Sequence, residues 1–174
     1  YTGDYEEFLE NVDAVYIASP NETHFEYAKK AIEAGKHVLS EKPLSFTKKE
    51  SEVLYTSAKE KGVVLMEAVK AAYCPGFQQL INVAKSGKIG DIVDVEASFT
   101  RLADPLSRER TDAEYGGAFL EFGPSVLVPV IKLMGKDYTS VTFDSIYDGN
   151  GVDLYTKADI RYDNGFATVK TGVG

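Results

Sequence analysis

The stretch "VDAVYIASPNETHFEYAKKAIEAGKHVLSEKPLS", from Val12 to Ser45, decides the fold because strand and helix patterns alternate along it. It opens with Val12 to Ala18, an almost continuous apolar run that is typical of a strand covered on both faces. Thr23 and Glu26 have the spacing of a capping box, and Gly35 offers a stop, so a helix is predicted between them. A second short apolar run follows, which gives the order strand, helix, strand.

The same alternation continues to about residue 70. Thr47 and Glu50 again have capping-box spacing and predict a second helix, which stops at Gly62. The run from Val63 to Met66 is predicted to be a third strand. Strands separated by helices pair in parallel through right-handed crossovers, so this part of the chain is predicted to be a parallel sheet.

After residue 70 the pattern changes. Asp91 to Thr100 alternates and predicts a half-exposed strand, whereas 101–115 is polar and irregular and indicates a long functional or flexible loop. Glu121 to Met134 is predicted to be an apolar helix, which Pro129 would bend unless the helix starts near it. An antiparallel meander is predicted from strands joined by "DGNG" and "DNG" turns, at 139–147, 153–162 and 166–170. The expected fold is therefore α/β, with the parallel sheet followed by an α+β domain whose open sheet is largely antiparallel.

The composition excludes several classes of function. The chain has 19 Lys and Arg against 27 Asp and Glu, a formal charge of −8, which argues against nucleic acid as a partner. No apolar run approaches the ~20 residues that a membrane helix needs, so we expect no membrane partner and a cytoplasmic protein. With one cysteine and two histidines, neither a disulfide framework nor a metal site is expected.

Polar residues follow each of the three predicted parallel strands, where ligands bind in open sheets of this kind. They are Ser19 to Asn21, Glu41 to Pro43, and Glu67 with Lys70. Lys42 is then either a cleft residue used in chemistry or a solvated loop lysine, and its position alone leaves both interpretations open.

The same stretch, Val12 to Ser45, closely resembles the middle of the nucleotide-binding domain of the Gfo/Idh/MocA oxidoreductases, named for glucose-fructose oxidoreductase and inositol dehydrogenase. The order of Pro20-Asn21, His24, Ala34 to Val38 and Glu41-Lys42-Pro43 carries the match. "SGKIGDIVDVEASF" and "GGAFLEFGPSVLVPVIKLMG" are similar to the family's second domain. The resemblance implies that residues 1–70 are the C-terminal part of a Rossmann domain, and that 71–174 begin a substrate and oligomerisation domain.

The resemblance implies hydride transfer between NAD or NADP and a hydroxyl-bearing carbon of a sugar, polyol or related small molecule. Lys42 then acts as the proton donor or acceptor, or steadies a developing oxyanion. The residues placed to bind the cofactor are Ser19, Pro20, Asn21, His24, Glu41 and Lys42. For His24 the alternative is an ordinary residue in the first turn of a helix. The resemblance also implies a homodimer, or a tetramer of dimers, through the second-domain sheet.

Three features depart from the family pattern. One is the loss of a basic residue that the family often carries shortly before the proline after the third strand, since Ala71 and Ala72 precede Tyr73-Cys74-Pro75 here. The family's second-domain helix usually carries an acidic residue and, four positions later, a histidine or tyrosine; here these positions are Glu121 and Ser125. A serine hydroxyl is a poor base without an activator, so a non-catalytic module for sensing a nucleotide or metabolite, or for assembly, is the alternative function. The glycine-rich turn Gly-x-Gly-x-x-Gly is also missing from the sequence, which indicates a fragment whose phosphate-binding part lies before Tyr1.

Overall fold

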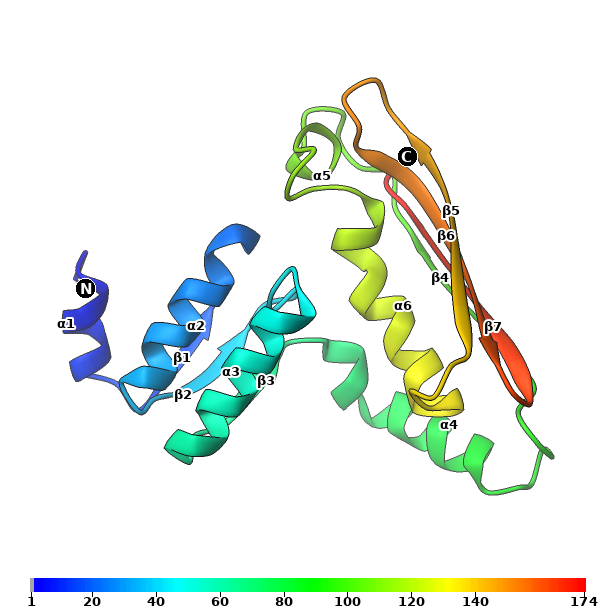
Figure 1. Cartoon of the computed structure of the whole chain (residues 1–174), viewed down its shortest axis with the longest axis horizontal. Coiled ribbons are helices and arrows are strands. Elements are labelled where there is room, and N and C mark those ends of the chain that lie inside the picture. Colours follow the sequence, from blue (N-terminus) through cyan, green and yellow to red (C-terminus); the bar gives the residue numbers. More distant parts are fainter. Residues whose placement is uncertain (1) are drawn as a thin grey trace. The chain divides into compact units, whose positions relative to one another are not determined.

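The computed structural model describes residues 2–174, which form two compact units (Figure 1). The first unit ends at Ala68, and the second runs from Val69 to Gly174. Each unit contains its own sheet and its own helices. Within residues 2–174, no helix combines the length and the apolar character needed to cross a bilayer.

The first unit is built on a parallel sheet with the strand order β1-β2-β3, as the sequence predicts. Tyr16 lies opposite Leu39, and Leu39 lies opposite Met66, so the three strands run in step. The strands are β1 (Ala14–Ile17), β2 (His37–Ser40) and β3 (Leu65–Glu67). The helices are α1 (Tyr5–Glu10), α2 (His24–Glu33) and α3 (Lys48–Lys61), with the 3₁₀ turn η1 (Asn21–Thr23) before α2.

Alternate strand residues of the first unit enter its core. Val15 and Val38 are buried with Ile32 of α2 and Leu54 of α3, in a cluster that joins helices to sheet. The residues between them point the other way, and the Tyr16 side chain is 58% exposed. The sequence predicts that the first strand, in the run from Val12 to Ala18, is covered on both faces. That expectation is wrong for β1 in this chain, because the crossover helices cover one face only.

The two predicted capping boxes have different outcomes. At the start of α3, the Thr47 hydroxyl accepts a hydrogen bond from the Glu50 amide at 3.2 Å, and the Glu50 carboxylate accepts one from the Thr47 amide at 3.0 Å. At α2 the prediction is wrong. The Thr23 hydroxyl donates to the Pro20 carbonyl at 2.7 Å, so it closes the turn η1 and does not cap the helix.

The second unit contains a four-stranded sheet with the order β4-β7-β6-β5. The last three strands form the predicted antiparallel meander, and β4 pairs with β7 in parallel. The strands are β4 (Asp94–Thr100), β5 (Ser140–Tyr147), β6 (Asp153–Tyr162) and β7 (Gly165–Gly172). The helical segments are η2 (Lys70–Tyr73), α4 (Pro75–Lys85), α5 (Arg108–Thr111) and α6 (Ala118–Met134).

Helix α6 runs along one face of this sheet and forms the core of the second unit (Figure 1). Val126 and Val130 of the helix pack with Ala158 and Ile160 of β6. The residues of β6 that alternate with these two positions point to the opposite face and are less buried.

The predicted start of α6 at Glu121 is wrong, because the helix begins at Ala118 and continues through both of its prolines. An aspartate from β6 provides the reason. The Asp153 carboxylate accepts a hydrogen bond from the Phe119 amide at 2.9 Å, and so satisfies one of the unpaired N–H groups in the first turn. Gly117 precedes the helix with a φ of +99°, and a Cβ there would lie 2.0 Å from Oδ1 of the same aspartate.

Burial of Leu54 makes a first prediction about stability. Its side chain is fully buried in the core of the first unit, so Leu54→Ala is expected to destabilise that unit by about 2–5 kcal/mol through the cavity it leaves. The neighbouring Val53 is 39% exposed, and Val53→Ala should change stability by less than about 1 kcal/mol. Urea unfolding measures both variants, and equal losses would contradict this account of the core.

Candidate functional site

The carboxyl ends of the parallel strands bring the predicted polar segments to one edge of the sheet. Backbone bonds extend the ladder beyond β2, from the Glu41 amide to the Ile17 carbonyl and from the Ala68 amide to the Ser40 carbonyl, each 2.8 Å. The segments that follow the three strands therefore start side by side. This is the edge at which open parallel sheets bind ligands, and Lys42 lies on it.

The loop that carries Lys42 is fixed by two side chains from other parts of the first unit. Pro43 follows the lysine through a cis peptide bond, and its carbonyl lies 2.7 Å from Nδ1 of His24. The next amide, that of Leu44, donates to the Glu67 carboxylate at 2.9 Å. Lys42 itself is half-buried, while Pro43 and Leu44 are buried. The structure therefore places Lys42 in a loop with defined attachments.

His24 is fully buried at the first position of α2. Nδ1 faces the Pro43 carbonyl, and Nε2 faces the Ser19 carbonyl at 2.9 Å. The ring thus joins two of the three polar segments. Sequence reasoning puts this ring at the edge of the cofactor pocket, whereas here both nitrogens are occupied by backbone oxygens.

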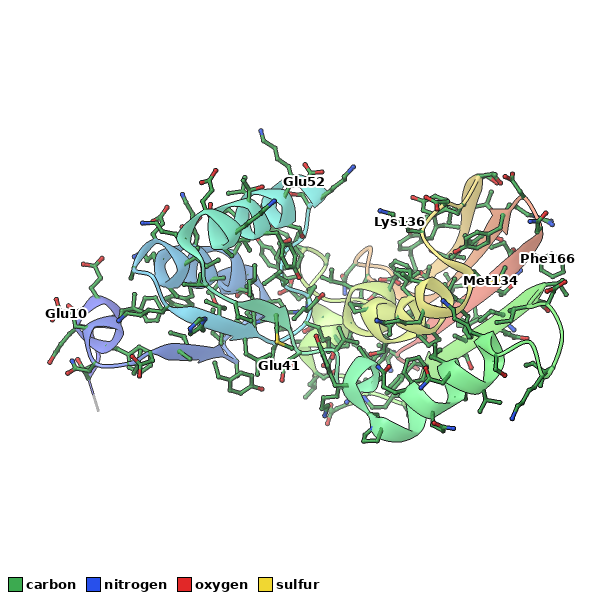
Figure 2. All side chains as sticks on the ribbon, turned by 90° about the horizontal axis from the view of Figure 1, so that it is seen from below. Glu10, Glu41, Glu52, Met134, Lys136 and Phe166 are labelled. Carbon is green, nitrogen blue, oxygen red and sulfur yellow. The ribbon has the colours of Figure 1, made fainter. Side chains whose placement is uncertain are left out.

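Tyr16 forms a contact that sequence reasoning missed. Its hydroxyl donates to the Glu41 carboxylate at 2.5 Å, beyond the end of β2, where Figure 2 labels Glu41. This hydrogen bond is the main cause that raises the pKa of Tyr16, with desolvation and the carboxylate charge adding to it. The strand register could have revealed this contact from the sequence, because Tyr16 lies opposite Leu39, two residues before Glu41.

The remaining predicted residues are distributed between the two units. Ser19, Pro20 and Asn21 form the turn after β1, where the Ser19 hydroxyl lies 2.5 Å from that of Thr23. Glu121 and Ser125 lie one turn apart on α6 of the second unit, and both side chains are partly buried. Within residues 2–174, no group of three His, Cys, Asp or Glu side chains is placed to hold a metal ion.

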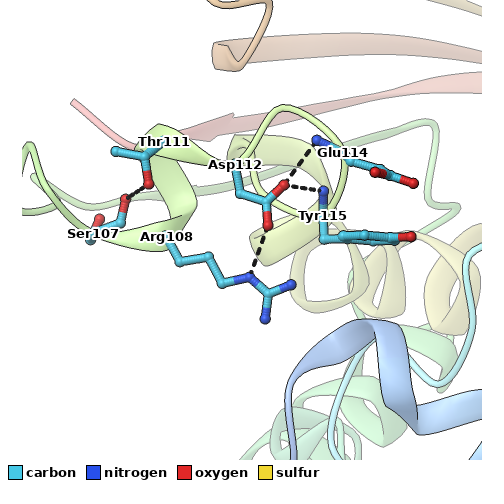
Figure 3. A network of polar contacts seen from close by, with 6 residues as sticks. All are labelled: Ser107, Arg108, Thr111, Asp112, Glu114 and Tyr115. Atoms are coloured by element: carbon cyan, nitrogen blue, oxygen red, sulfur yellow. Dashed lines mark hydrogen bonds and ion pairs between the residues drawn. The ribbon is translucent and has the colours of Figure 1, made fainter.

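The polar segment before α6 is ordered by its own charges and includes the short helix α5 (Figure 3). Asp112 accepts hydrogen bonds from the amides of Tyr115 and Glu114 at 2.9 and 3.0 Å, and from Nε of Arg108 at 3.3 Å. The Tyr115 amide is the largest cause that lowers the pKa of Asp112. A segment that the sequence indicates as functional or flexible thus has internal partners that brace the turn leading into α6.

Comparison with known proteins gives the same family for both parts of the chain. Residues 1–69 match the GFO_IDH_MocA profile, described as "Oxidoreductase family, NAD-binding Rossmann fold", and residues 77–173 match "GFO/IDH/MocA C-terminal domain". The uncharacterized oxidoreductase YhhX of Escherichia coli is 32% identical, covering 98% of this chain and 50% of its own. The scyllo-inositol 2-dehydrogenase (NADP(+)) IolU of Bacillus subtilis is 34% identical over 90% of this chain and 49% of its own.

A solved structure supports the likeness in three dimensions. A 3-ketoreductase from Actinomadura kijaniata, in complex with TDP-benzene and NADP, superposes with a TM-score of 0.83 at 30% identity. The match covers 98% of this chain and 52% of that one. The chain thus spans about half the length of the relatives it matches.

The bond between Tyr16 and Glu41 makes a second prediction. A raised tyrosine pKa means that the fold favours the protonated phenol, so this bond adds stability below pH ~10 and loses it as the pH rises through the raised value. In Glu41→Gln an acceptor remains but its charge is removed, and the pKa of Tyr16 is expected to fall towards its ordinary value. A pH titration of the tyrosine ring carbons by NMR measures the shift, with Tyr16→Phe assigning the signal.

Tyr5 is the matched control for this titration. Burial is the main cause that raises the pKa of Tyr5 to about 12, and its hydroxyl donates to the Tyr27 carbonyl. Its titration should therefore be the same with and without the Glu41→Gln change. A Tyr16 titration that is equally unaffected would show that the carboxylate does not control this phenol.

Proposed function

This chain belongs to the GFO/IDH/MocA family of oxidoreductases, and we propose that the protein transfers a hydride between NAD or NADP and a hydroxyl-bearing carbon of a sugar, polyol or related small molecule. The observation that carries the proposal is the placement of Lys42 on the carboxyl edge of the parallel sheet, in a loop whose backbone is hydrogen-bonded before and after the lysine. The names of the relatives supply the substrate class, since they include an inositol dehydrogenase and a sugar ketoreductase.

The residues of the first unit fit one half of such a cofactor. Ser19 and Asn21 offer hydroxyl and amide groups, and Glu41 and Lys42 offer one charge of each sign, which suits the carboxamide and the ribose hydroxyls of a nicotinamide nucleoside. Residues 2–174 contain no Gly-x-Gly-x-x-Gly turn for the pyrophosphate. We therefore assign Ser19, Pro20, Asn21, Glu41 and Lys42 to the nicotinamide half alone.

Lys42 is proposed to move the proton that accompanies the hydride. A bound nicotinamide dinucleotide supplies the hydride acceptor or donor. When an alcohol is oxidised, the hydrogen of its C–H bond would leave for the nicotinamide together with both bonding electrons, as a hydride. The neutral amine of Lys42 takes the hydroxyl proton as the carbonyl forms. In the reverse direction the ammonium group gives that proton to the carbonyl oxygen and stabilises the negative charge that develops there.

Glu121 and Ser125 are proposed to contribute from the second unit, with Glu121 as a partner in proton transfer and Ser125 as a hydrogen-bonding group. Serine at this position also favours a second candidate function, that of a non-catalytic module for sensing a nucleotide or metabolite or for assembly. A serine hydroxyl cannot serve as a base at neutral pH without an activator. The enzyme remains the better-supported candidate because Glu41, Lys42 and Pro43 are present as a unit.

Replacing Lys42 makes a third prediction, which separates the two candidates. In the intact protein, Lys42→Met should lower turnover by roughly 100-fold or more, while the dissociation constant of the dinucleotide stays within a few-fold. Absorbance of the reduced nicotinamide, measured with a panel of polyols and ketoses, reports turnover, and calorimetry reports binding. Lys61→Met, at the exposed end of α3, is the control. Normal turnover in Lys42→Met would remove this lysine from the mechanism, and binding without turnover in the unmutated protein would favour the sensor.

We also propose a homodimer, or a tetramer of dimers, through the open face of the second-unit sheet. Thr100, Ile146, Tyr155 and Gly172 form a row across the four strands and line a surface hollow of about 410 Å³. A second copy of the chain is the proposed occupant, since an aromatic ring beside an apolar hollow is typical of interface centres.

The charges on this face are paired with one another. Lys157 donates to Asp159 at 2.6 Å, and Lys170 of β7 pairs with Glu96 of β4. The Arg161 guanidinium lies over the Phe166 ring, 5.6 Å from its centre. Paired charges need less free energy to be removed from water than unpaired ones, so this pairing supports the use of the face as a contact surface.

A fourth prediction tests the contact between copies. Sedimentation of the intact protein at tens of micromolar should give at least twice the mass of one chain. Tyr155→Asp introduces a charge into the hollow, and Arg161→Asp removes a cation from an aromatic ring, so both should shift the distribution towards monomer. Glu60→Lys, exposed on α3, is the control. A monomeric protein would contradict the proposed contact between copies. An oligomer whose mass is unchanged by both substitutions would show that this surface is not the contact.

A further inference from the structure

We propose that His24 and Glu67 are positioning residues that fix the Lys42 loop from two sides, through contacts with the backbone that follows the lysine. The kinetic part of this inference rests on the proposed function, whereas the hydrogen bonding of the two side chains does not. The His24 ring lies within hydrogen-bond distance of the Pro43 carbonyl, and the Glu67 carboxylate accepts a hydrogen bond from the Leu44 amide. Neither side chain needs to touch a substrate to have this effect.

The two partners of His24 connect the loop after β1 with the Lys42 loop. Nδ1 and Nε2 face the carbonyl oxygens of Pro43 and Ser19, at 2.7 and 2.9 Å. A carbonyl oxygen accepts hydrogen bonds, so a ring N–H is its natural partner in a buried site. The ring therefore holds the backbone after Lys42 against the turn that follows β1.

Glu67 holds the other side of the loop. Proline has no N–H, so the first amide after Lys42 is that of Leu44, and its partner is Oε1 of Glu67 at 2.9 Å. Leu44 is 3% exposed, so water has little access to its amide and does not replace the carboxylate as hydrogen-bond acceptor. The carboxylate therefore links the loop after β2 to the end of β3.

Backbone contacts lie on both sides of Lys42. The Glu41 amide before it is bound to the Ile17 carbonyl, and the Pro43 carbonyl and Leu44 amide after it are bound to His24 and Glu67. A proton donor or acceptor works only within hydrogen-bond reach of the reacting oxygen, and a displacement of about 1 Å costs roughly 100-fold in rate. Fixing the backbone on both sides is a direct way to meet that demand.

The first experiment tests His24 without any activity. His24→Leu removes both ring nitrogens, so hydrogen exchange of the neighbouring Leu44 amide in the intact protein should quicken at least tenfold. His24→Gln keeps an N–H donor and is expected to restore part of the protection. Unchanged exchange in His24→Leu would overturn the role of His24.

The second experiment tests Glu67 with a pair of variants. Glu67→Leu removes the acceptor, so exchange of the Leu44 amide should quicken at least tenfold, and kcat should fall roughly 10- to 100-fold with the KM for dinucleotide little changed. Glu67→Gln keeps an acceptor oxygen and is expected to restore protection and most of kcat. Unchanged exchange at Leu44 in Glu67→Leu would overturn the role of Glu67. A protein inactive on every substrate would instead reject the proposed function, and the exchange results would still decide this inference.

Discussion

Parallel pairing of β1, β2 and β3 is the constraint on which the rest of the first unit depends. Because the strands run in step, the segments that follow them leave the sheet at one edge and meet there. Tyr16 then reaches Glu41, 25 residues away, and Leu44 reaches Glu67, 23 residues away. A slip of one residue between β1 and β2 would move Tyr16 to the opposite face and break its contact with Glu41, and a slip between β2 and β3 would do the same to Glu67 and its contact with Leu44.

Features of the fold that depend on neighbouring residues could be predicted from the sequence, and those that depend on distant partners could not. Helix α3 has both of its end signals within its own segment, at Thr47 and Gly62, and both are present in the structure. The start of α6 depends on Asp153, which lies 34 residues after the amide it caps. At Thr23 the hydroxyl had two possible partners, and the Pro20 carbonyl competed successfully with the helix.

The candidate site also has some features that could be predicted from neighbouring residues and others that depend on distant partners. That Lys42 follows a parallel strand is visible in the sequence, because strand ends and their polar neighbours form a local pattern. The partners of its loop are not visible, since His24 could equally have been an ordinary first-turn residue and Glu67 shows only that a polar residue follows β3. Tyr16 lies within an apolar run and resembles a core residue until the register opposite β2 is known.

The paired charges on the open face of the second-unit sheet affect how quickly another protein surface could find it. Lys157 and Lys170 each have a carboxylate partner on the same face, so the field that extends into solvent from this region is weak. Long-range attraction then adds little to the rate of encounter, and association at this face is governed by fit after collision. Its on-rate would consequently depend only slightly on ionic strength.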